Sequence, residues 1–163
     1  MALEGELRLF GIMRSMMRSM METVDSEQLY EMPAGGGNSP GWIVGHLTLG
    51  SWFGVALLDG REIDENLLKH YGPGSASDVP VDQRLEKADL LAEEQEAADA
   101  FLAAIEAADP AAFDKPQQTG ILEKAFPTVG NMLSHLLASH YSMHTGQLSA
   151  WRRNRGMPSI LKL

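Results

Sequence analysis

The chain has 163 residues, of which 44% are hydrophobic and 21% are charged, and this composition indicates one globular domain spanning residues 1–163. Its net charge of −9 argues against binding to nucleic acids or anionic membranes, because both require clustered Lys and Arg. The absence of cysteine excludes disulfides, thiolate metal ligands and a cysteine nucleophile. The acidic N-terminus does not resemble a secretory signal. From these two observations we expect a cytoplasmic protein.

Two helices are predicted in the first part of the chain. Residues 2–24 place apolar side chains at helical spacing and include a stripe of methionines over residues 13–21. Such a stripe predicts core packing, with an adaptable pocket wall or a dimer face as the alternative. Residues 40–58 are predicted to form the second helix, because the segment Asn38-Ser39-Pro40 supplies an N-cap and an early proline, and Asp59-Gly60 ends it.

Two more helices are predicted in the second part. Residues 81–108 are rich in Ala, Glu, Leu and Lys, and Pro110 stops them. Residues 128–155 end in arginines followed by Gly156, as suits a helix C-terminus. No segment alternates like a strand. We therefore predict an all-α fold, a four-helix bundle in which the long connection over residues 60–80 crosses over.

Charged residues are missing from two stretches, residues 32–58 and 125–151, which contain four of the five histidines. The apolar helix over residues 40–58 is long enough to suggest a membrane span. Its glycines, histidine, threonine and serine weaken its apolar character, and no basic flank sets an orientation. We expect the buried central helix of a bundle and no membrane association.

The histidines of these stretches suggest a metal site. His140 and His144 are four residues apart, so they share a helix face and could bind one ion. His46 lies on an apolar face of the other uncharged helix. A buried imidazole needs a partner, and three of them could share a metal; hydrogen-bonded core histidines are the alternative. By helix phase His135 faces another way and is structural or partly exposed, while His70 lies in a surface loop that could close over the site.

Other metal chemistries fit the sequence poorly. The segment HYSMH lacks the glutamate that serves as general base in HExxH proteases. No Glu-x-x-His pair occurs, so a ferritin-like di-iron site is not expected.

Three segments together resemble the DinB/YfiT-like superfamily of metalloenzymes: NSPGWIVGHL at residues 38–47, YGPGS at 71–75 and HLLASHYSMHTGQL at 135–148. The resemblance implies a four-helix bundle, often dimeric, whose metal ligands are His46, His140 and His144. Zinc or nickel is the implied ion. Characterised members include bacillithiol-dependent thiol transferases and mycothiol-dependent maleylpyruvate isomerases. The larger isomerases carry an additional C-terminal domain, which we do not expect here.

We expect a homodimeric, metal-dependent enzyme that transfers a low-molecular-weight thiol to a small-molecule electrophile. The alternatives are a metal-dependent hydrolase and a non-catalytic metal-binding dimer. Hydrolysis would work best with a general base, which the loop acids Asp64, Glu65 or Asp78 could supply. Gln147 could orient a ligand or serve only in packing.

Overall fold

The computed structural model describes residues 3–160, and its regular elements are helical throughout that range, apart from one isolated bridge between Pro116 and Thr128. The α-helices are α1 (Glu4–Glu22), α2 (Pro40–Asp59), α3 (Glu65–Tyr71), α4 (Lys87–Ala107), α5 (Val129–Ser134) and α6 (Tyr141–Asn154). A π-helical segment, His135–His140, joins α5 to α6, and short 3₁₀ turns cover Ser26–Gln28, Val81–Gln83 and Pro110–Ala112.

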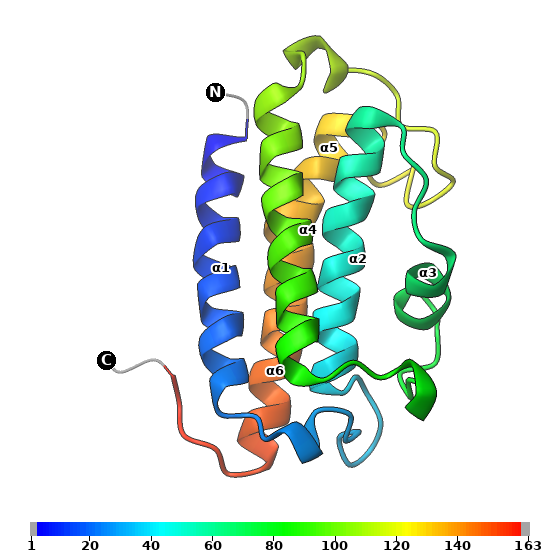
Figure 1. Ribbon diagram of the computed structural model, residues 1–163. Helices are drawn as coiled ribbons and strands as arrows, with labels where there is room; N and C mark the ends of the chain where they lie inside the picture. The colour runs from blue at the N-terminus through cyan, green and yellow to red at the C-terminus, as the bar shows by residue number, and fades with distance from the viewer. Residues whose placement is uncertain (1–2, 161–163) are drawn as a thin grey trace.

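The long helices lie side by side, with α2 packed against α4 and α6, and α1 packed against α6 (Figure 1). Helices α2 and α4 run in the same direction, so the chain between them must return along the length of the molecule (Figure 1). This return carries α3, which packs on the outside of α2. The all-helical class and the long connection after α2 are therefore as predicted.

The predicted bounds differ from the structure in two places. Helix α4 begins at Lys87 instead of at residue 81, because the backbone around Leu85 is extended and pairs with Tyr30. The Tyr30 hydroxyl donates to the Leu85 carbonyl and accepts from the Leu85 amide, a contact between distant parts of the chain. The connection predicted over residues 60–80 contains α3, whose first turn is capped by the Asp64 carboxylate.

Helix α2 is the central core helix. It is long and apolar enough to pass as a membrane span by length and composition, yet 67% of its most apolar window is buried inside the molecule. Two of its glycines let neighbouring side chains approach closely. The ring of Tyr71 lies where a side chain on Gly45 would be, and the ring of Phe101 lies where a side chain on Gly54 would be. Burial by neighbouring elements thus accounts for its missing charges.

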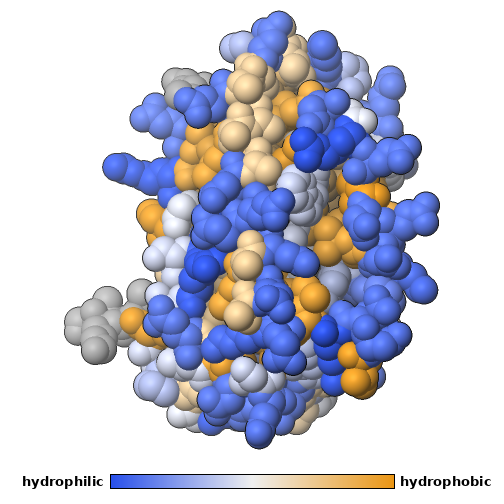
Figure 2. Space-filling view, viewed as in Figure 1, coloured by the Kyte–Doolittle hydropathy of each residue, from blue (hydrophilic) through white to orange (hydrophobic). Residues whose placement is uncertain are grey.

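Some methionines of the stripe over residues 13–21 lie in the core, and others lie partly at the surface. Met17, Met20 and Met21 are fully buried, so the prediction of core packing is confirmed for them, whereas Met13 and Met16 are half-buried. On the face shown in Figure 2, hydrophilic side chains predominate, with small apolar patches between them.

Candidate metal centre

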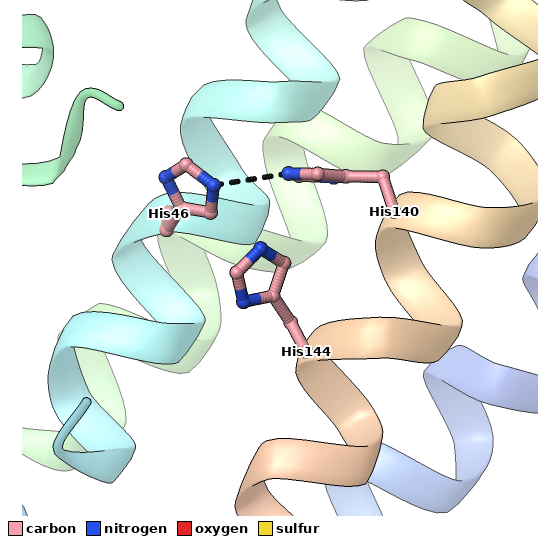
Figure 3. A group of neighbouring side chains, drawn as sticks. All are labelled: His46, His140 and His144. Atoms are coloured by element: carbon pink, nitrogen blue, oxygen red, sulfur yellow. Dashed lines mark hydrogen bonds between the residues drawn. The ribbon is translucent and has the colours of Figure 1, made fainter. Parts of the chain in front are cut away.

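Three histidine side chains from two helical segments converge inside the molecule (Figure 3). One nitrogen from each of His46, His140 and His144 lies within 4.8 Å of the others, and the Nε2 atoms of His46 and His140 are 3.0 Å apart. All three residues are buried, with 8%, 9% and 4% of their surface exposed. The predicted convergence of these three residues is therefore observed.

Hydrogen bonds on the far side of two rings orient them toward one another. The Nδ1 atom of His46 lies 2.5 Å from the carbonyl oxygen of Tyr71. A carbonyl only accepts, so Nδ1 carries the proton and the Nε2 lone pair points to the centre. His144 repeats this arrangement, with Nδ1 3.0 Å from Oε1 of Gln147. Partners of this kind fix the tautomer and ring orientation of metal-binding histidines.

A chain of polar side chains holds Gln147 in place. Its Oε1 atom also accepts a hydrogen bond from Nδ2 of Asn38 at 3.0 Å, and Asn38 in turn accepts one from Ser77. Gln147 therefore holds the ring of His144, a contact that neither of the two roles considered for it had named. The sequence signal was its spacing, one turn beyond His144.

Packing also sets the positions of the rings. Trp42 stacks on His46 with ring centroids 4.6 Å apart, and the indole nitrogen of Trp42 donates to Ser75. Gly50 faces His140, where a Cβ atom would lie 2.9 Å from the ring. The glycine therefore makes the room that the His140 imidazole occupies.

Burial keeps the three imidazoles neutral. It lowers the pKa of His46, and together with the neighbouring histidines it lowers the pKa of His140 to about 2 and that of His144 to about 4. Neutral imidazole is the form that binds metals, since the lone pair must be free.

The π-helical segment changes the position of His135. In a π-helix the backbone bonds span five residues instead of four, so residues five apart come into register. The rings of His135 and His140 are accordingly 5.6 Å apart, and His135 stacks on Phe126 at 4.3 Å. The prediction that His135 faces another way is wrong because it assumed α-helical phase throughout; the prediction of partial exposure is correct.

A cavity of about 370 Å³ adjoins the three histidines. Its wall comes from α2, α3, the loop before α5, and α5–α6, and includes His135. Within residues 3–160, no Asp, Glu, Lys or Arg lines it. The cavity therefore places an apolar space directly beside the imidazole nitrogens.

The other candidates lie outside this cavity. Asp64 caps α3, Asp78 pairs with Arg84, and Glu65 is an exposed residue of α3. His70 is half-buried and lines a separate cavity with Asp64, so it does not close over the three histidines. None of the loop acids reaches the site.

The donor set fits a divalent first-row ion. Three imidazole nitrogens at about 2.1 Å from a tetrahedral ion lie roughly 3.4 Å from one another. The Nε2 atoms of His46 and His140 are 3.0 Å apart, and one nitrogen of each of the three rings lies within 4.8 Å of the others. Imidazole ligands suit zinc and nickel, and three protein ligands leave a coordination position open. The group could therefore hold a metal ion with an open position.

Comparison with known proteins finds a family model and a solved structure that match the chain. The family model of the DinB superfamily matches residues 9–148, a range that contains the three converging histidines. A solved structure of an uncharacterised protein from Escherichia coli UTI89 shares the fold, with a TM-score of 0.63 and 17% identity over 94% of each chain. No curated protein matches the chain at a significant level.

Proposed function

This chain belongs to the DinB superfamily, and on that premise we propose that His46, His140 and His144 hold one divalent ion, zinc or nickel, inside a four-helix bundle. The observation that carries the proposal is the convergence of three buried, neutral imidazoles, two of which, His46 and His144, have their outer nitrogens fixed by Tyr71 and Gln147. We further propose that the protein transfers a low-molecular-weight thiol to a small electrophile.

The chemistry follows from an open coordination position in an apolar cavity. When bound, a divalent ion supplies a positive charge that favours the thiolate form of a thiol ligand, and the thiolate is the nucleophile. The chain has no cysteine, so the thiol comes from outside. The cavity wall holds the electrophile and excludes water. With an epoxide, a sulfur–carbon bond forms as a carbon–oxygen bond opens, and the thiol proton ends on the new hydroxyl.

The wall of the cavity favours thiol transfer over hydrolysis. Hydrolysis by an activated water works best with a general base, commonly a carboxylate, near the ion. Among the residues described, no carboxylate lines the cavity, and Asp64, Glu65 and Asp78 lie elsewhere. The metal-dependent hydrolase and the non-catalytic metal-binding protein remain the alternatives that experiment must separate.

The metal-binding part is tested by metal analysis of protein purified without chelators. We expect about one divalent ion per chain, and loss of the ion in His46→Ala, His140→Ala and His144→Ala. His135→Ala is the matched control, because its ring lies at the cavity but outside the converging group. Loss of metal from His135→Ala together with retention in His140→Ala would overturn the assignment.

The reaction is tested with cobalt-substituted protein. Thiolate coordination adds a sulfur-to-metal charge-transfer band, so bacillithiol, mycothiol, glutathione and coenzyme A are titrated in turn, and turnover is then measured with an epoxide and an alkyl halide. We expect one thiol to produce the band and to be transferred, and His144→Ala to abolish both. If no thiol changes the spectrum while esters or amides are hydrolysed in a metal-dependent way, hydrolysis replaces thiol transfer. Metal binding without any turnover supports the non-catalytic alternative.

A further inference from the structure

The mouth of the cavity beside the three histidines is rimmed by apolar side chains that face water. Leu68, Leu122 and Met143 all line it, and they are 45%, 53% and 52% exposed. They come from three separate segments: α3, the loop before α5, and α6. Exposed apolar side chains that gather around a concave site mark a place where a ligand buries them.

The interior of the cavity continues this apolar surface. Leu49 and Phe53 from α2 and Leu136 from the π-helical segment form part of its wall. Among residues 3–160, the ionisable side chains in the wall are histidines, and none of Asp, Glu, Lys or Arg is there to pair with a charged ligand. A carboxylate, phosphate or ammonium group carried into the part of this space that lies away from the histidine nitrogens would lose its hydration without gaining a partner.

One residue of the rim is held in an uncommon backbone conformation. Leu122 has φ +52°, in the left-handed region that bulky side chains rarely occupy. Its carbonyl oxygen accepts hydrogen bonds from the amides of Ala125 and Phe126, both at 2.9 Å. The surrounding loop therefore holds Leu122 in this conformation. Such conformations cluster at ligand-binding sites.

The loop is anchored from inside the protein. Gln117 is buried, and its Nε2 donates to the carbonyl oxygens of Ile121 at 2.8 Å and Phe126 at 3.0 Å. Phe126 stacks on His135 in the cavity wall. These contacts tie the rim to the π-helical segment and keep Ile121 and Leu122 over the cavity.

From this geometry we infer that the cavity binds the uncharged apolar body of the substrate, an alkyl chain or a single aromatic ring, and that Leu122 and Met143 determine this specificity by closing over it. The inference rests on the proposed function, because it assigns the electrophile that reacts at the histidine site to the class of neutral, apolar compounds. It excludes electrophiles that carry a carboxylate or a phosphate on the part of the molecule that lies away from the reacting carbon.

The test uses binding by metal-free protein, so that it does not depend on metal chemistry or turnover. Straight-chain 1-alkanols from butanol to octanol are titrated while the methyl resonance of Met143 is followed by NMR. Each added methylene is expected to tighten binding about fourfold until the cavity is full. An affinity that is independent of chain length overturns the inference.

Two variants examine the rim. Glycine suits the backbone at φ +52°, so Leu122→Gly should melt at the same temperature as the wild type. Because the variant loses the apolar side chain, its binding of octanol should be roughly tenfold weaker. Met143→Ser should weaken it to a similar extent, with binding to this variant followed by calorimetry. Val81→Ser is the matched control, because Val81 is 77% exposed and lies outside the cavity. Unchanged binding in both rim variants contradicts the inference.

The remaining outcomes separate this inference from the proposed function. If alkanols bind with the expected chain-length dependence but no thiol is transferred, the reaction assignment fails and the binding assignment stands. If transfer occurs but 5,6-epoxyhexanoate, which carries a carboxylate at the end remote from the epoxide, is as good a substrate as 1,2-epoxyhexane, the specificity assignment fails alone. If Leu122→Gly instead dissociates an oligomer in sedimentation, the rim is an interface between two copies and the inference is overturned.

Discussion

The histidine rings are positioned by groups that do not themselves face the centre. His46 and His144 each use Nδ1 to reach an acceptor, the Tyr71 carbonyl and the Gln147 side chain, and so direct Nε2 inward. The Tyr71 acceptor belongs to the backbone and survives any substitution there. Of these two hydrogen-bond acceptors, the side chain of Gln147 is the one that a substitution can remove.

Gln147→Leu is expected to weaken metal binding by about 10–100-fold, because His144 loses the acceptor that fixes its tautomer and ring orientation. Competition with a chromophoric chelator measures this affinity. Gln95→Leu is the control, since Gln95 is an exposed residue of α4 that bonds only to Asp99. Equal affinities in wild-type protein and Gln147→Leu would show that packing alone orients the ring.

The lowered pKa values of the histidines predict how the stability of metal-free protein depends on pH. Burial lowers the pKa of His140 to about 2 and that of His144 to about 4, whereas an unfolded histidine titrates near 6.5. Between about pH 4 and 6.5 the unfolded chain therefore binds more protons, so stability rises with pH and levels off above this window.

Urea denaturation of the metal-free protein at pH 5.5 and 7.5 measures this dependence. The midpoint should be lower at pH 5.5, and His144→Gln should reduce the difference because one buried imidazole no longer resists protonation. His70→Gln, which changes a half-buried histidine outside the group, is the control. A midpoint that does not change between the two pH values would argue against neutral buried imidazoles.

At the scale of the elements, one buried carboxylate joins three helices. Glu94 of α4 is 1% exposed and accepts hydrogen bonds from Arg14 at 2.7 Å, from Arg18 at 2.6 Å and from the hydroxyl of Tyr141 at 2.8 Å. The arginines belong to α1 and the tyrosine to α6. Glu94 therefore fixes how α4 sits against the other two helices.

Removing this carboxylate leaves the partly buried guanidinium of Arg14 and the buried hydroxyl of Tyr141 without their shared acceptor, although Arg14 keeps a contact of 3.6 Å with Asp99. Glu94→Ala is expected to lower the free energy of unfolding by about 3–5 kcal/mol. Chemical denaturation measures the change, and Glu96→Ala, at an exposed position two residues later, should stay within about 0.5 kcal/mol of the wild type. A similar small effect for Glu94→Ala would mean that the helices pack without the ion pair.

At the scale of the whole molecule, the half-buried methionines of α1 border a hollow of about 330 Å³ against α6. Met13 and Met16 line one side of it, and Ser142, Gly146 and Ser149 line the other. Small residues opposite flexible methionines suit close packing of another helix. We expect this face to form the interface of a homodimer.

Gly146→Arg tests the dimer without disturbing the fold of one chain, because nothing lies within 4 Å of a Cβ atom placed at Gly146. Sedimentation should show a dimer for the wild type and a monomer for the variant. Gln95→Arg, on the exposed face of α4, should remain dimeric. If the wild type sediments as a monomer at roughly tens of micromolar, this face is not a dimer interface, and its methionines only pack within the single chain.

Local patterns were enough to predict most of the helices and the three converging histidines. The spacing of apolar residues and the caps define α1 and α2 to within about two residues. His140 and His144 stay on one face because the chain between them is α-helical from Tyr141 onward. The absence of charge around His46 indicated a buried helix, and burial is what brings it to the other two.

Contacts between distant residues decided the rest. The sequence by itself determined the helical class and the His140/His144 pair, because both depend on neighbours a few residues apart, and it pointed to His46 through an uncharged helix and the resemblance to the superfamily. Only the tertiary structure decided that His135 turns to the cavity through a π-helical segment, that Leu122 lines the cavity, and that Gln147 meets Asn38. Asn38 and Gln147 are 109 residues apart, and no local pattern encodes which distant group a polar side chain will find.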